Sequence, residues 1–142
     1  MEKLDSKSLM LGDWVRRRWT CRDTGREVVQ DFQVTEIRKN GETLYAWSKS
    51  GNMGRVEELE PIPITPEILE KNGFGYKEED ENFAHYYLGE PHFCKDMGLH
   101  IGSNKKGAYC TNIGYNDIYG LRYVHELQHA LRLCGIEKEI EL

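Results

Sequence analysis

The chain has 142 residues, of which 39% are hydrophobic, 30% charged and 11% aromatic. This composition is typical of a soluble globular protein and excludes a disordered or membrane-spanning chain, because no apolar run approaches about 20 residues. The net charge is −5, and the acidic residues occur throughout the chain rather than in a tail. Such a molecule weakly repels phosphate backbones, so nucleic acid is not an expected partner without a local basic patch. Residues 1–10 lack a signal-peptide pattern, which predicts a cytoplasmic protein.

The four cysteines are far apart in the chain and form no C-x-x-C pair: Cys21, Cys94, Cys110 and Cys134. This spacing fits neither a zinc ribbon nor a dense disulfide scaffold. We therefore expect free, mostly buried thiols.

The first half of the chain predicts short strands joined by tight turns. Strands are expected over 14–19, 28–37 and 44–47, with turns at Gly12-Asp13, Thr24-Gly25, Asn40-Gly41 and residues 50–54, since glycine and asparagine tolerate the backbone angles of such turns. Short strands should follow through residue 64, where Pro61 and Pro63 restrict the segment to a sheet edge. Residues 9–64 thus favour a small SH3-like β-barrel.

The second half predicts an antiparallel β unit with two helices, over residues 65–142. Thr65-Pro66-Glu67 starts a short helix that ends at Gly73. A polar loop is expected over 77–82, strands over 83–88, 98–101 and 108–113, and a hairpin tip over 103–107. The fold class is therefore α+β.

A helix should follow a break at Asn116-Asp117 and end at Gly135. Residues 136–142 then alternate apolar and acidic side chains, which predicts an edge strand with Glu137, Glu139 and Glu141 in water. Such a strand makes a homodimer possible.

The run His125-Glu126-Leu127-Gln128-His129 matches the pattern H-E-x-x-H. In a helix, two histidines four residues apart lie on one face and can share a Zn²⁺ ion, while the glutamate poises a metal-bound water. A zinc-dependent hydrolase is therefore one alternative function, with His125 and His129 as metal-ligand candidates.

The surroundings of this run argue against zinc. The apolar residues of the helix gather on one arc, so the arc with His125, Gln128, His129 and Arg132 should face outward. Arg132 lies on the histidine stripe, where its charge opposes a cation. A third ligand would have to come from the final strand or from upstream, the candidates being Glu137, Glu139, Glu141, His85, His92 and His100. We predict no catalytic residue, no metal and no cofactor.

Two other clusters supply candidate ligand-binding residues. Trp14 to Trp19 mixes three arginines with two tryptophans, a combination that can hold phosphates and stack bases. On a strand, Arg16 and Arg18 share a face with Trp14, whereas Arg17 joins Trp19. This split leaves weak nucleic-acid binding as a second alternative, against a solvated strand. Tyr86 and Tyr87, near His85 and His92, either line a pocket or pack in the core.

Three segments together resemble a group of uncharacterised small proteins of gut anaerobes and their phages and prophages. They are Leu11-Gly12-Asp13-Trp14-Val15, the run from Glu58 to Phe74 (ELEPIPITPEILEKNGF) and Tyr123 to His129 (YVHELQH). The resemblance implies a mobile-element context and carries no established activity. Members of the group often have Gln at the position of Glu126 and Asn at that of His129, so the H-E-x-x-H match here is a departure from the group.

These observations favour a non-enzymatic accessory protein of phage type that binds a host protein or a small ligand. One form of the hypothesis is an inhibitor of a host-defence enzyme, and another is sequestration of a host nucleotide signal. The absence of a complete catalytic set and the resemblance both support binding over catalysis. Such a role requires no membrane contact.

Overall fold

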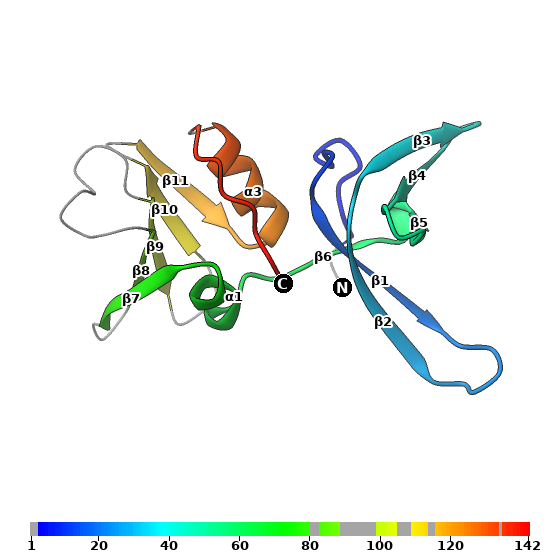
Figure 1. The fold of residues 1–142 in the computed structure, drawn as a ribbon, viewed down its shortest axis with the longest axis horizontal. Helices are drawn as coiled ribbons and strands as arrows, with labels where there is room; N and C mark the ends of the chain where they lie inside the picture. The colour runs from blue at the N-terminus through cyan, green and yellow to red at the C-terminus, as the bar shows by residue number, and fades with distance from the viewer. Residues whose placement is uncertain (1–2, 80–82, 89–98, 105–108, 114–115, 134) are drawn as a thin grey trace. The chain divides into compact units, whose positions relative to one another are not determined.

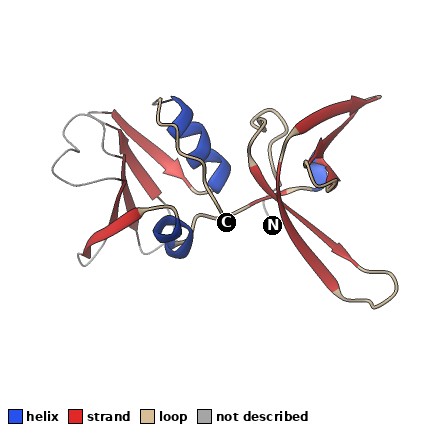
Figure 2. Cartoon of the chain, viewed as in Figure 1, coloured by secondary structure: helices blue, strands red, loops and turns tan. Residues whose placement is uncertain are grey.

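The computed structural model describes residues 3–79, 83–88, 99–104, 109–113, 116–133 and 135–142. The chain forms two compact units, Met1–Ile62 and Pro63–Leu142, called unit 1 and unit 2 below. Antiparallel sheets dominate both, with few helices (Figures 1 and 2). The α+β class predicted from the sequence is therefore confirmed.

Unit 1 consists of two three-stranded antiparallel sheets. The first has the order β2-β1-β6, with β1 at Trp14–Thr20, β2 at Glu27–Gln33 and β6 at Glu60–Pro61. The second has the order β3-β4-β5, with β3 at Glu36–Asn40, β4 at Thr43–Trp47 and β5 at Met53–Arg55. A 3₁₀ turn, η1, at Val56–Glu58 leads into β6.

The core of unit 1 follows from side-chain alternation along the strands. Val15 is fully buried whereas its neighbours Trp14 and Arg16 are partly exposed, because successive side chains on a strand point to opposite faces. Buried apolar residues from both sheets and from the N-terminal segment form one cluster: Leu4, Leu9, Val15, Phe32, Val34, Ala46, Val56 and Leu59.

The expected SH3-like barrel is not confirmed, because the strands of unit 1 form two separate sheets and no barrel closure is found among the described residues. The single strand expected over 28–37 is interrupted at Val34 and Thr35. Val34 pairs through its backbone with Gly12 and Asp13, and the Thr35 N–H donates to the carbonyl of Trp47 at 2.8 Å. The chain thus leaves one sheet and enters the other at this corner.

Two local predictions for unit 1 need correction. Asn40 pairs with Thr43 at the end of the β3–β4 hairpin, so the two-residue loop is Gly41–Glu42 rather than Asn40–Gly41. Gly41 has φ +62°, which favours glycine at that position. At Val56 the expected strand is the η1 turn. Pro61 lies on the edge strand β6, as predicted from its missing N–H.

Unit 2 contains a five-stranded antiparallel sheet in which neighbours in sequence are neighbours in space, in the order β11-β10-β9-β8-β7. The strands are β7 at Phe74–Glu79, β8 at Phe83–Leu88, β9 at Leu99–Asn104, β10 at Tyr109–Ile113 and β11 at Asn116–Leu121. Helix α1 spans Pro66–Lys71 and helix α3 spans Val124–Leu133.

The short helix α1 begins and ends as its sequence predicts. The Thr65 hydroxyl accepts a hydrogen bond from the Ile68 N–H at 3.3 Å, and Pro66 occupies the first turn. Gly73, just past the helix, has φ +81°. Leu69 is the fully buried residue of this helix, which anchors an element too short to be stable alone.

Two expectations about loops and breaks in unit 2 are wrong. Residues 77–79 continue strand β7 instead of forming a loop, and Asn116-Asp117 begins strand β11 instead of breaking the pattern. The hairpin expected between the next two strands is confirmed by the antiparallel pairing of β9 with β10, although Ser103 and Asn104 still belong to β9 and residues 105–107 lie outside the described residues.

The C-terminal segment 136–142 has no strand pairing, which removes the reason given above for a dimer. Its three glutamates are exposed, as predicted, and Ile140 is buried. Figure 1 shows this segment running back from the end of α3 toward α1. No described helix is long and apolar enough to cross a lipid bilayer.

Candidate ligand-binding groove

A groove of about 430 Å³ lies in unit 1, between the start of β1, the end of β2 and the turn that joins β4 to β5. This volume lies in the range of about 300–1,000 Å³ that is typical of small-ligand sites. The lining combines two aromatic rings with hydroxyl, amide and charged groups: Trp14, Asp31, Phe32, Gln33, Thr35, Ser48, Lys49, Ser50 and Asn52. Of the sequence candidates, Trp14 is the one that lines it.

Hydrogen bonds within and around the turn before β1 hold Trp14, the first residue of that strand, in place. The buried Asp13 carboxylate accepts the N–H of Met10 at 2.8 Å, and the Asp13 carbonyl accepts the N–H of Val34 at 2.8 Å. Gln33, which lies opposite Trp14 in the β1–β2 register, donates its side-chain amide to the Gly12 carbonyl at 3.0 Å. These bonds restrain the backbone before Trp14 and beside it. The half-buried Trp14 ring is therefore attached to a well-ordered backbone.

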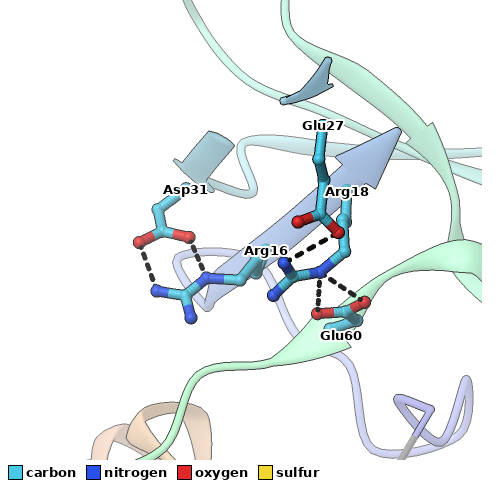
Figure 3. A network of polar contacts seen from close by, with 5 residues as sticks. All are labelled: Arg16, Arg18, Glu27, Asp31 and Glu60. Carbon is cyan, nitrogen blue, oxygen red and sulfur yellow. Dashed lines mark hydrogen bonds and ion pairs between the residues drawn. The ribbon is translucent and has the colours of Figure 1, made fainter. Parts of the chain in front are cut away.

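Arg16 acts on the groove through Asp31. Its guanidinium donates from Nε and Nη2 to the two Asp31 oxygens at 2.7 and 2.9 Å, in a two-point contact (Figure 3). This hydrogen bonding raises the pKa of Arg16 above its ordinary value. Because both side chains are less than a third exposed, the pair is more than a loose surface contact. It fixes the Asp31 carboxylate in the groove wall.

Arg18 does not line the groove. Its guanidinium lies between Glu27, at 3.1 Å, and Glu60, at 3.3 Å, and so links the three strands β2, β1 and β6 (Figure 3). Hydrogen bonding to Glu27, then to Glu60, raises the pKa of Arg18. The predicted phosphate-binding role of Arg16 and Arg18 thus competes with carboxylates that already neutralise both cations.

The split of the Trp14–Trp19 cluster between two faces is confirmed. The Arg17 guanidinium stacks over the ring of Trp19, with Cζ 4.8 Å from the ring centroid, whereas Arg16 and Arg18 share the opposite face with Trp14.

The tyrosine candidates lie in unit 2, away from this groove along the chain. Tyr86 on β8 is 5% exposed, so core packing describes it better than ligand contact. Tyr87 follows it on β8, and its side chain lies outside the described residues, as do those of His85 and His92.

Sequence reasoning missed the polar turn that forms the far wall of the groove. Asn52 accepts a hydrogen bond from the Gln30 amide at 2.9 Å, and its N–H donates to the Ser48 hydroxyl at 3.0 Å. The available signal was the run Ser48-Lys49-Ser50-Gly51-Asn52, which the sequence marks as a turn and nothing more. Its partner across the groove, β2, is distant in sequence.

Helix α3 presents its histidines differently from the prediction. His125 and Gln128 are buried, at 6% and 5% exposure, and His129 is half-buried, so the expected outward orientation is wrong for the first two, whereas Arg132 is exposed as predicted. The rings of His125 and His129 lie 5.7 Å apart in an edge-on arrangement, and the Tyr123 ring stacks on His125 at 5.9 Å. Among the residues that the structure describes, no group of three potential ligands surrounds a common point.

Glu126 caps the helix that carries it. Its Oε2 accepts the backbone N–H groups of Arg122 at 2.7 Å and Tyr123 at 3.1 Å, which is the reach-back contact of a capping box. A catalytic glutamate in an H-E-x-x-H site would instead contact a metal-bound water. The geometry therefore assigns Glu126 to the start of α3.

We expect Glu126→Ala to lower the free energy of unfolding of unit 2 by about 1 kcal/mol, because two N–H groups at the helix start lose their acceptor. Glu126→Gln should cost less, since an amide oxygen can still accept. Urea unfolding followed by circular dichroism would measure both. Equal stability of all three proteins would contradict the capping role.

No family model, curated protein or solved structure matches this chain. The groove and its chemistry therefore carry the functional argument by themselves.

Proposed function

We propose that this chain is a non-enzymatic accessory protein that binds a host protein or a small polar ligand in the Trp14 groove. The observation that supports this most is the combination of one partly exposed indole with a ring of hydrogen-bonding groups, including the Asp31 carboxylate, in a hollow of about 430 Å³. Binding sites commonly join an aromatic surface to a few fixed polar groups in this way.

The electrostatics of the groove favour a polar ligand with little net charge. Asp31 is already paired with Arg16, and Lys49 supplies the second charged group of the lining. The remaining polar groups, on Gln33, Thr35, Ser48, Ser50 and Asn52, offer donors and acceptors without charge. A peptide segment of a host protein meets these requirements, because its backbone amides can pair with them while one side chain packs on Trp14.

The phage or prophage setting, and with it a cytoplasmic site of action on a host-defence enzyme, is part of the same proposal and rests on the sequence resemblance alone. The contacts of Glu126 support binding over zinc hydrolysis, because the carboxylate of the H-E-x-x-H run accepts hydrogen bonds from the backbone at the start of its own helix.

The proposal predicts that Trp14→Ala abolishes capture of the partner. Immobilised wild-type protein is incubated with a lysate of a gut anaerobe, and bound proteins and metabolites are identified by mass spectrometry. Recovery should fall about tenfold or more with Trp14→Ala, as for a central aromatic contact in an interface.

The matched control is Trp19→Ala, which removes the same side chain from strand β1 of unit 1 at a position outside the groove. It should leave recovery of a groove ligand unchanged, and circular dichroism should show both variants folded. Equal recovery with wild type and Trp14→Ala, or no specific capture by the wild type, would contradict the proposal.

A further inference from the structure

A second hollow, of about 320 Å³, lies on the sheet β3-β4-β5 of unit 1. Its lining is Arg38, Lys39, Asn40, Tyr45, Trp47 and Met53, and it shares no residue with the Trp14 groove. Arg38 lies opposite Tyr45, and Trp47 lies opposite Met53, in the strand registers. Cross-strand partners share a face of the sheet, so these four side chains stand together on it. Ala46, between Tyr45 and Trp47 in the chain, is buried on the other face.

The residues that line this hollow are suited to a ligand that combines a negatively charged group with a planar ring. Its cation on the face of the two rings is Arg38, because strand alternation turns the neighbouring lining residue Lys39 to the other face, and the lining contains no carboxylate. The rings of Tyr45 and Trp47 are both partly exposed and supply stacking surfaces, and the Asn40 amide adds hydrogen-bonding groups. Arginine beside an indole is an arrangement that holds a phosphate while a base stacks nearby. Here the Arg38 Cζ lies 5.4 Å from the centroid of the Trp47 ring.

Arg38 can exchange its present partner for a ligand phosphate. Its guanidinium donates from Nε and Nη2 to the Glu36 carboxylate, and this hydrogen bonding lowers the pKa of Glu36 and raises that of Arg38. The two side chains are 62% and 47% exposed, and ion pairs at such exposure contribute little to stability. Glu36 therefore competes with an anionic ligand for Arg38, but the ion pair is weak enough for the ligand to displace it.

The overall acidity of the chain does not oppose an anion at this place. Residues 1–62 contain eleven Lys and Arg and eleven Asp and Glu, so the net charge of −5 belongs entirely to residues 63–142. Repulsion of phosphates, expected from the whole-chain charge, is thus absent from unit 1 as a net effect.

We propose that this hollow binds a nucleoside phosphate, with the base stacked against Trp47 or Tyr45 and the phosphate held by Arg38. The volume, at the low end of small-ligand sites, suits one nucleotide unit. That unit is either a free nucleotide or one residue of a single strand, since both present the same base and phosphate. The site shares no lining residue with the Trp14 groove, and the proposal does not rest on the function assigned to that groove.

The test titrates the full chain with the four ribonucleoside monophosphates, with an oligouridylate strand and with inorganic phosphate, by calorimetry and by the indole N–H signals in ¹H–¹⁵N spectra. We expect nucleotide binding that shifts the Trp47 signal and weakens about tenfold or more in Arg38→Ala. Glu36→Gln, which frees Arg38, should strengthen binding by about two- to fivefold. This gain cannot be produced by a variant that fails to fold.

Glu42→Gln is the matched control, because it removes one negative charge from the neighbouring β3–β4 loop without releasing Arg38. It should change affinity less than Glu36→Gln. A strand that binds more tightly per nucleotide than the monophosphates identifies nucleic acid as the source, and equal binding identifies free nucleotides. No binding at millimolar nucleotide, indifference to Arg38→Ala, or binding of inorganic phosphate as tight as that of nucleotides would overturn the proposal.

Discussion

Replacing Asn72 by alanine should lower the free energy of unfolding of unit 2 by about 2–4 kcal/mol, the sum expected for several buried hydrogen bonds. The Asn72 side chain is buried, and both its amide nitrogen and its amide oxygen form hydrogen bonds. Its Nδ2 donates to the carbonyls of Ile68 at 2.8 Å and Glu141 at 2.7 Å, and its Oδ1 accepts the Glu141 N–H at 2.7 Å. Because these bonds fasten the C-terminal segment to helix α1, the change should also expose Ile140. Chemical denaturation and amide hydrogen exchange would measure both effects.

Asn72→Asp provides the isosteric comparison and adds a pH signature. The new oxygen would face two carbonyls that now receive donors, so the ionised form is disfavoured and its folded-state pKa rises above the unfolded value of about 4. Stability relative to wild type should therefore be best below about pH 4 and be lost as pH rises through the folded pKa. A deficit independent of pH, or an alanine variant as stable as wild type, would show that these hydrogen bonds contribute little.

Replacing Gly54 by alanine should destabilise unit 1 by about 1–3 kcal/mol through overpacking. A Cβ built on Gly54 would lie 2.7 Å from Cδ2 of Leu59 and 3.6 Å from Cδ of Arg17. Leu59 is fully buried in the core cluster, so its side chain has no free space to move into. Gly54 does not have a positive φ, and the predicted loss is therefore steric rather than conformational. Thermal or urea unfolding of the two proteins would give the difference.

Leu59→Val separates this clash from other effects of the added methyl group. Valine lacks the Cδ atoms, so the double variant Gly54→Ala with Leu59→Val should be more stable than the sum of the single changes predicts, by about 0.5 kcal/mol or more. Strictly additive losses would place the cost of Gly54→Ala somewhere other than at Leu59.

The sequence predicted features that depend on neighbours along the chain. The common face of Trp14, Arg16 and Arg18 follows from strand alternation, and the limits of α1 follow from Thr65, Pro66 and Gly73. These signals act within a few residues, where the same local chemistry operates in the folded chain.

Features that depend on partners distant in sequence were not predictable in this way. Nothing local to Val34 and Thr35 marks the point where the chain changes sheets, because the hydrogen bonds that fix it come from Gly12, Asp13 and Trp47. The same holds for Arg16, whose partner Asp31 is brought opposite it by the β1–β2 register. The arginines were therefore candidates for phosphate binding until their carboxylate partners were known.

The burial of the polar stripe on α3 has a similar cause. Helical periodicity places His125 and Gln128 opposite the apolar arc, but it does not reveal how much of the helix circumference other parts of the chain cover. Burial of both residues shows that this cover extends beyond the apolar arc. The prediction of outward-facing histidines assumed a helix lying on a single layer.

The turn between β4 and β5 adjoins both hollows of unit 1. Trp47 and Met53 line the hollow with Arg38, while the next residues inward, Ser48 and Asn52, line the Trp14 groove. The Ser48 N–H donates to the Asn52 carbonyl at 2.8 Å, which ties the two ends of the turn together. An occupant that restrained this turn from one side would change the entropy lost on binding at the other, and thermodynamic linkage makes that influence equal in both directions.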